Sequence, residues 1–158
     1  KYKNKTVLRT LPEGYIFKKI LKFNFIPLLT AIVSRDAFDE VGGLSSHLKQ
    51  AEDYELFVKI SNTKKVRAVQ DVVAFYRVHE SNLSIGNEQK GFDESIEIIN
   101  RYIPQSSASR GLSYHHSDYG LQKIKSGKLM EGFNHIISYG SFIDLIAIVM
   151  RKTTRTLW

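Results

Sequence analysis

Two adjacent acids, Glu52 and Asp53, are the residues of this chain whose types are best suited to chemistry. A carboxylate can accept the proton of an alcohol while the alcohol oxygen attacks an electrophilic carbon, which is general-base catalysis. The acids open a segment that predicts a helix from Glu52 to Ile60, in which Leu56 and Ile60 stand four residues apart. Because the macrodipole favours an ionised acid at the start of a helix, we expect a low pKa here. A Glu-Asp pair taken by itself is more often an ordinary pair of first-turn acids that stabilises the helix.

A second group of candidate residues follows the segment from Val72 to Val78, whose alternating pattern predicts a strand. The neutral imidazole of His79 can ligate a divalent metal, and the guanidinium of Arg77 can hold a phosphate through two hydrogen bonds. Ser84 either donates a hydrogen bond to such a phosphate or forms a turn. A histidine at the end of a strand is more often a surface or capping residue, so the residue types alone leave both interpretations open.

A glycine pair, Gly42 and Gly43, lies between these elements and ends a helix that Ser34 is expected to cap. Glycine adopts the positive φ of a helix end at low cost, and its lack of a side chain leaves room for a ligand. Before this helix, Pro27 breaks the chain and the run from Leu29 to Val33 predicts a buried strand. A helix end and a ligand-contacting loop are both open interpretations of the glycines.

The remaining segments predict one further strand and several helices. The strand is expected from Val66 to Val69, and an early short helix carries the apolar residues Ile16, Ile20, Leu21 and Phe23. After residue 86 the pattern is helical, with a stripe at Phe92, Ile96 and Ile99, a serine-rich linker from Ser106 to Ser109, a helical hairpin around Gly127 and a last apolar helix beginning near Ser141.

Three motifs together resemble a known family. They are the run from Arg35 to Gly43, the Glu52-Asp53-Tyr54 element, and the run Tyr76-Arg77-Val78-His79, and they are similar to the second half of the catalytic domain of family 2 glycosyltransferases of the GT-A type. The resemblance covers about residues 25–85. It implies an α/β fold, a fragment of the GT-A (nucleotide-diphospho-sugar transferase) fold with short strands and helices in residues 1–86, followed by an α-helical C-terminal extension in residues 87–158.

The same resemblance implies a function and a role for each candidate residue. An inverting enzyme of this family moves a sugar from a nucleotide-diphosphate donor to a hydroxyl of a cell-surface glycan or lipid-linked acceptor, with Asp53 as general base and Glu52 orienting the acceptor. His79 would contact a divalent metal, manganese or magnesium, in the full-length enzyme. Contacts to substrate and diphosphate would come from Gly42, Gly43, Arg77 and Ser84.

Two motifs of such enzymes are missing from the chain. No Asp-x-Asp sequence and no glycine-rich phosphate loop occurs, so we expect this to be part of a longer enzyme and to be inactive alone. A Gln-x-x-Arg-Trp element, which processive synthases of the family carry after the acidic pair, is also missing, which favours transfer of a single sugar.

Composition limits the other possibilities. The chain has 158 residues, 42% hydrophobic, with 23 basic and 16 acidic residues and a net charge of +7. It contains no cysteine, so disulfides and thiolate chemistry are excluded. The apolar run from Phe142 to Met150 contains Asp144 and is shorter than the roughly 20 residues of a membrane span. We expect the fragment itself to be soluble, and the resemblance implies a cytoplasmic location, with peripheral contact to the inner face of a membrane as an option.

Two alternatives to an enzyme remain open at this point. A non-enzymatic basic helical module could bind anionic membrane or nucleic acid through its lysine clusters, although no RNA-binding aromatic motif or recognition helix accompanies the charge, so nucleic acid is not expected. An interaction or oligomerisation domain, in which the helical tail recruits partners or forms a homodimer, is the other. For the enzyme fragment itself, removal of half a sheet would leave an unpaired edge and exposed apolar surface, so self-association is expected as well.

Overall fold

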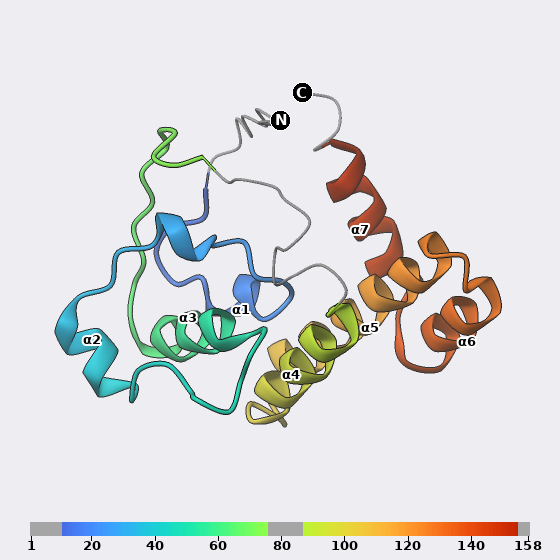
Figure 1. Ribbon diagram of the computed structural model, residues 1–158, viewed down its shortest axis with the longest axis horizontal. Helices are drawn as coiled ribbons and strands as arrows, with labels where there is room; N and C mark the ends of the chain where they lie inside the picture. The colour runs from blue at the N-terminus through green and yellow to red at the C-terminus, as the bar shows by residue number, and fades with distance from the viewer. Residues whose placement is uncertain (1–10, 76–86, 155–158) are drawn as a thin grey trace. The chain divides into compact units, whose positions relative to one another are not determined.

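The computed structural model describes residues 11–75 and 87–154, with side chains up to residue 152. These residues form seven α-helices and one 3₁₀ helix (Figure 1). In chain order the elements are α1 (Phe17–Ile20), η1 (Leu28–Thr30), α2 (Arg35–Glu40), α3 (Glu52–Thr63), α4 (Glu88–Asn100), α5 (Ser106–Lys125), α6 (Leu129–Tyr139) and α7 (Phe142–Thr154). The chain divides into two compact units, Lys1–Ser95 and Ile96–Trp158, so the division falls within α4, whereas the sequence predicts a boundary at residue 86.

The predicted α/β fold is wrong, because the described part of the chain contains no β-sheet. Its β-structure is a single antiparallel bridge, in which Gly14 and Val66 exchange backbone hydrogen bonds of 2.8 and 2.9 Å. The segment predicted as a strand from Leu29 to Val33 contains the end of η1 instead. Residues 66–69 contribute only the bridge, and residues 72–75 are not in a strand; residues 76–78 lie outside the described residues.

The reason for this difference is that a strand depends on a partner. Its backbone groups need a neighbouring strand, and its side chains need a surface to pack against, so β-propensity depends strongly on context. The β-branched and aromatic side chains here have no such surface within the described residues, since Val69, Val72, Val73 and Phe75 are between 61% and 74% exposed. Local sequence preference alone therefore does not produce the strand.

The core of the first unit lies between α1 and α3, which pack against each other (Figure 1). Three residues at α1, Ile16, Ile20 and Leu21, are completely buried, as the early apolar stripe predicts. Helix α3 is buried over five consecutive residues from Tyr54 to Val58, so it is enclosed on several sides. The hydroxyl of Tyr54 donates a hydrogen bond of 3.1 Å to the carbonyl of Leu21, which ties the two elements together.

The predicted helix before the glycine pair is confirmed as α2. The hydroxyl oxygen of Ser34 accepts a hydrogen bond of 3.3 Å from the N–H of Ala37 and so caps the N-terminus. At the other end, the N–H of Gly42 donates to the carbonyl of Asp39 (3.1 Å) and the N–H of Gly43 donates to that of Phe38 (2.9 Å). This is the Schellman pattern, and it requires the positive φ of 79° that Gly42 adopts.

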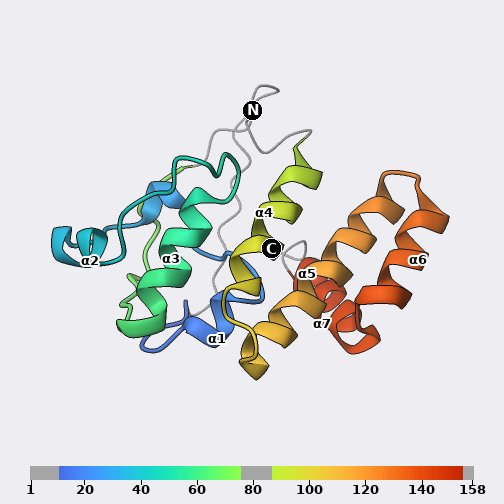
Figure 2. The same cartoon turned by 90° about the horizontal axis from the view of Figure 1, so that it is seen from below.

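In the second unit, α5 and α6 form the predicted helical hairpin, and the two helices run side by side (Figures 1 and 2). The turn between them contains Gly127 at a φ of 89°. The predicted linker from Ser106 to Ser109 is wrong, because these residues form the first turn of α5 and Ala108 within it is fully buried. A buried side chain stabilises this turn, although serine is only a moderate helix former.

The last predicted helix is confirmed as α7, which packs on α5. The two helices are joined at Ser117, whose hydroxyl oxygen accepts a hydrogen bond of 2.8 Å from the N–H of Ser141. Helix α7 buries Ile148 but exposes other large apolar residues, among them Phe142, Ile143 and Met150. Over residues 11–75 and 87–154, none of the helices combines the length and the apolar character needed to cross a membrane.

Candidate functional site

The acidic pair lies where the sequence predicts, in the first turn of α3. Glu52 is the first residue of the helix and Asp53 is the second, and both are half-buried. The preceding residue, Ala51, occupies the N-cap position and has no side chain that could satisfy the free backbone N–H groups of a helix start. The site therefore sits on a helix N-terminus that depends on other parts of the chain.

Hydrogen bonds from Tyr54 and Asn24 hold the carboxylate of Asp53 in place. Its Oδ1 atom accepts a hydrogen bond of 2.6 Å from the N–H of Tyr54, and the side chain of Asn24 also hydrogen-bonds to it. Burial raises the pKa of Asp53 above its ordinary value, the hydrogen bond from Tyr54 opposes this, the neighbouring charge of Glu52 raises it further and Asn24 lowers it. The expected low pKa is thus wrong, because desolvation outweighs the helix start.

Glu52 contributes an unsatisfied acceptor beside this carboxyl group. Its Oε2 atom is buried and has no hydrogen-bond partner among the described residues. A buried carboxylate oxygen without a donor carries a desolvation cost of about 1–3 kcal/mol. A ligand hydroxyl donating to this atom would remove that cost, so Glu52 is suited to hold an alcohol next to Asp53.

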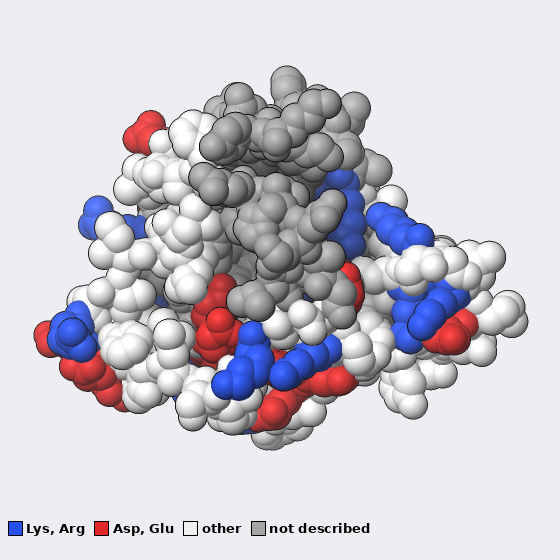
Figure 3. Space-filling view, in the orientation of Figure 1, with Lys and Arg blue, Asp and Glu red and all other residues white. Residues whose placement is uncertain are grey.

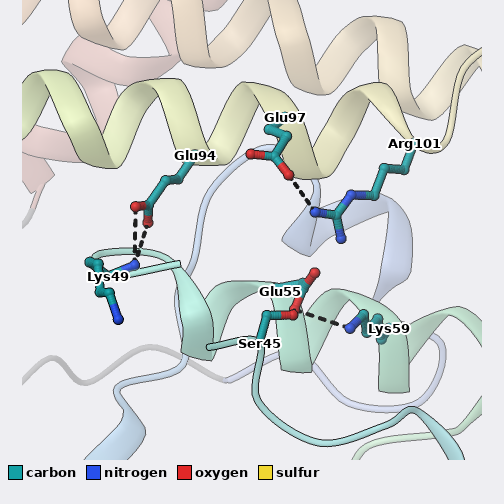
Figure 4. Close-up of polar contacts among 7 residues, drawn as sticks. All are labelled: Ser45, Lys49, Glu55, Lys59, Glu94, Glu97 and Arg101. Atoms are coloured by element: carbon teal, nitrogen blue, oxygen red, sulfur yellow. Dashed lines mark hydrogen bonds and ion pairs between the residues drawn. The ribbon is translucent and has the colours of Figure 1, made fainter. Parts of the chain in front are cut away.

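The loop before α3 is fixed by a carboxylate from α4. Glu94 is buried, with 8% of its surface exposed, and it accepts hydrogen bonds from three consecutive backbone N–H groups, those of Lys49, Gln50 and Ala51. Figure 4 shows the side chain of Glu94 reaching from α4 towards the loop at Lys49. All four residues belong to the first unit.

A second buried acid anchors the other end of the same loop. The hydroxyl of Ser45 donates a hydrogen bond to Oε2 of Glu55, and the ammonium of Lys59 lies 3.0 Å from the same oxygen (Figure 4). Only 1% of the Glu55 surface is exposed, so its charge is compensated by these contacts. Glu55 therefore has a structural role, whereas Asp53 forms no ion pair within the described residues.

The other predicted site residues divide into two groups. The pair Gly42 and Gly43 ends α2, and the Schellman pattern accounts for the positive φ of Gly42; contact of the pair with a diphosphate stays a prediction. Arg77, His79 and Ser84 lie outside the described residues, so their roles stay predictions too. In the described part of the chain, no group of three or more histidines and acids could hold a metal ion.

Sequence reasoning missed two residues that shape the site, Asn24 and Glu94. No pattern in the sequence connects Asn24 with Asp53, because the contact depends on how α1 packs against α3. Glu94 did give a signal. It stands four residues before the fully buried Ile98 on α4, and an acid on the buried face of a helix needs a partner.

A histidine pair in the second unit forms a separate cluster. Nδ1 of His116 and Nε2 of His135 lie 3.0 Å apart, and the rings of Tyr119 and Tyr139 pack against them. Burial lowers the pKa of both histidines; for His116 the charge of His135 adds to the effect, and for His135 that of Lys123 does. Neutral rings that share one hydrogen bond suit the packing of α5 on α6, so we treat the pair as structural.

Comparisons with known proteins add no relative to these observations. No protein-family model, no curated protein and no solved structure matches the chain. The site at the start of α3 is therefore interpreted from its own residues and contacts.

Proposed function

We propose that this chain forms the acceptor-side part of an inverting glycosyltransferase and that Asp53 is its general base. The observation that carries the proposal is the pairing of a half-buried carboxyl group of raised pKa, Asp53, with the unpartnered buried oxygen of Glu52. The resemblance of the Glu52-Asp53-Tyr54 element to family 2 glycosyltransferases supports the choice of reaction. The α/β fold that the same resemblance implied is wrong for the described residues and gives no support.

In the proposed reaction, a hydroxyl oxygen of the acceptor attacks the anomeric carbon of the donor sugar. The bond from that carbon to the diphosphate breaks on the opposite face, and the electron pair leaves with the nucleoside diphosphate. Asp53 accepts the hydroxyl proton as the new bond forms. Its raised pKa makes it a stronger base than an exposed aspartate. Glu52 accepts a hydrogen bond from the acceptor and holds it in place.

The donor side of the reaction depends on residues that the structure does not describe. His79 and Arg77 are proposed to contact the diphosphate and a manganese or magnesium ion in a longer enzyme that contains this chain. The metal would neutralise charge on the leaving group when bound. Since the described residues offer no group of three ligands for it, we assign no step of the reaction to the metal.

The proposed acceptor is a glycan or a lipid-linked sugar on the cytoplasmic face of a membrane, and the proposed location is the cytoplasm with peripheral membrane contact. Exposed apolar side chains on α6 and α7, among them Phe133, Ile137 and Ile143, support such contact. A basic module that binds anions through charge alone has less support. On the face in Figure 3, basic and acidic side chains of the described residues stand next to one another, without a continuous basic area.

The proposal is tested by Asp53→Asn in the longer protein that contains this chain. The assay measures transfer of labelled sugar from a panel of nucleotide sugars to lipid-linked and glycan acceptors. Loss of the base should lower the rate by a factor of about 10² to 10⁴, while binding of the nucleotide sugar is retained. A matched control is Asp36→Asn, which alters an exposed acid in the first turn of α2 and should leave the rate unchanged.

A second variant separates the two sides of the reaction. His79→Ala should weaken metal-dependent nucleotide binding, which Asp53→Asn leaves intact. If the two variants lose nucleotide binding equally, or if Asp53→Asn transfers sugar at the wild-type rate, the assignment of Asp53 as the base is wrong.

A further inference from the structure

We infer that Glu94, on α4, is a positioning residue that sets the geometry and the protonation of the Glu52-Asp53 turn from outside α3. The inference deepens the proposed function and rests on it for its meaning in catalysis. Its physical part, the control of the Asp53 carboxyl group by Glu94, can be tested on the chain by itself.

Both carboxylate oxygens of Glu94 accept backbone hydrogen bonds from the loop before α3. Oε1 of Glu94 accepts from the N–H of Lys49 at 3.0 Å, and Oε2 accepts from the same group at 3.1 Å, from that of Gln50 at 2.8 Å and from that of Ala51 at 2.9 Å. Three consecutive backbone N–H groups thus converge on one carboxylate. A surface contact would be shared with water, whereas only 8% of the Glu94 surface is exposed.

The carboxylate of Glu94 provides a hydrogen-bond acceptor at the start of α3. The N-cap residue is Ala51, which has no side-chain acceptor, so α3 has no cap of its own. Glu94 places a negative charge beside the positive end of the α3 macrodipole and accepts from the N-cap N–H itself. Hydrogen bonds to an ionised acceptor are stronger than those between neutral groups, so the loop is held firmly.

The position of Asp53 follows from this contact. Asp53 comes two residues after Ala51, so the backbone that Glu94 fixes leads directly into the acidic pair. The approach of α4 to the loop is also close at Gly91, where an added Cβ would lie 3.7 Å from Cβ of Gln50. Burial is the largest cause of the raised pKa of Asp53, and burial of the turn depends on the loop being held against the protein.

A matched residue on the same helix lacks these contacts. Glu97 pairs with Arg101 at 2.6 Å one turn further along, and its side chain is 52% exposed (Figure 4). Glu97→Gln therefore removes the same charge from an exposed side chain of α4, and it serves as the control for Glu94→Gln.

The experiment uses nuclear magnetic resonance on the whole 158-residue chain. In the wild type, the amides of Lys49, Gln50 and Ala51 should exchange slowly with solvent, because each donates a hydrogen bond to the buried Glu94 carboxylate. In Glu94→Gln, these amides should exchange with solvent at least tenfold faster, and the titration midpoint of Asp53 should move down towards 3.8. Glu97→Gln should leave both properties as in the wild type.

Two further outcomes separate the inference from the proposed function. If the titration midpoint of Asp53 is unchanged in folded Glu94→Gln, the inference is overturned, whatever the rate of sugar transfer by the longer enzyme. Should that variant not fold, rapid solvent exchange of the amides of residues 49–51 in the folded wild type overturns the inference equally. In the longer enzyme, Glu94→Gln should lower kcat for sugar transfer with little change in KM for the donor. If the Asp53 midpoint moves as expected but Asp53→Asn transfers normally, the positioning role stands and the proposed function fails.

Discussion

At the scale of the residue, Asp53 lowers the stability of the fold at neutral pH. Its pKa is higher in the folded state than the ordinary 3.8, so the folded state binds the proton more tightly. Stability therefore falls as the pH rises from about 3.8 through the folded pKa, and the loss is complete above it. Such a cost is typical of a residue kept for its chemistry.

Asp53→Asn should remove this cost, because asparagine stays neutral and its Oδ1 can still accept from the N–H of Tyr54. Urea denaturation should give a higher unfolding midpoint for the variant than for the wild type at pH 7, with the difference shrinking towards pH 3.5. The exposed-acid variant Asp36→Asn should show no comparable pH-dependent gain. A gain for Asp53→Asn that is equal at both pH values would contradict the account.

The residue scale also shows how far sequence reasoning reached at the site. The position of Asp53 in the first turn of a helix was predictable, because the helix pattern of residues 52–60 is local. The direction of the Asp53 pKa shift was not predictable, because burial and the contact with Asn24 come from residues distant in sequence. The Schellman end at Gly42 and Gly43 was predictable for the same local reason as the helix.

At the scale of the elements, the packing of α5 on α6 depends on two glycines facing each other, Gly120 and Gly132. A Cβ added at Gly132 would lie 2.5 Å from the carbonyl oxygen of Gly120 and 2.9 Å from the backbone nitrogen of Ile124. Both are backbone atoms, so the helices would have to move apart. We expect Gly132→Ala to lower the free energy of unfolding by about 1–3 kcal/mol, measured by denaturant titration.

The control for this variant is Gly91→Ala on α4, where the nearest atom to the added Cβ is 3.7 Å away, an ordinary contact. Because alanine is the better helix former, Gly91→Ala should be neutral or stabilising by up to about 1 kcal/mol. Equal destabilisation by the two variants would mean that close helix packing is not the reason for Gly132.

The elements that sequence reasoning predicted and those it missed differ in where their hydrogen bonds lie. Helices α2, α3, α4, α6 and α7 close their hydrogen bonds within themselves, and their start and end signals are local, so they were predictable. The expected strand at residues 66–69 needed a partner along its whole length and has only the bridge to Gly14. The residues favour a strand by their local preference, but without a neighbouring strand they do not form one.

At the scale of the whole molecule, the chain consists of two compact units, and α4 contributes residues to both. The acidic pair, its loop and Glu94 all belong to the first unit, whereas the histidine pair and the glycine contact of α5 and α6 belong to the second. Net charge gave little guidance to function, and several of the described basic residues form pairs with acids, such as Lys64 with Glu40 and Lys123 with Glu131. The proposed function therefore depends on the first unit.

The most direct test of the proposed function compares two pH profiles of the same carboxyl group. One is the carbon-13 titration of Asp53 in the chain, and the other is the rate of sugar transfer, kcat/KM, by the longer protein that contains it. If Asp53 is the base, the rate falls on the acidic side with a midpoint equal to the Asp53 titration midpoint, and both lie above 3.8. An Asp53 midpoint at or below 3.8, or a transfer rate that does not change as Asp53 takes up its proton, would contradict the account.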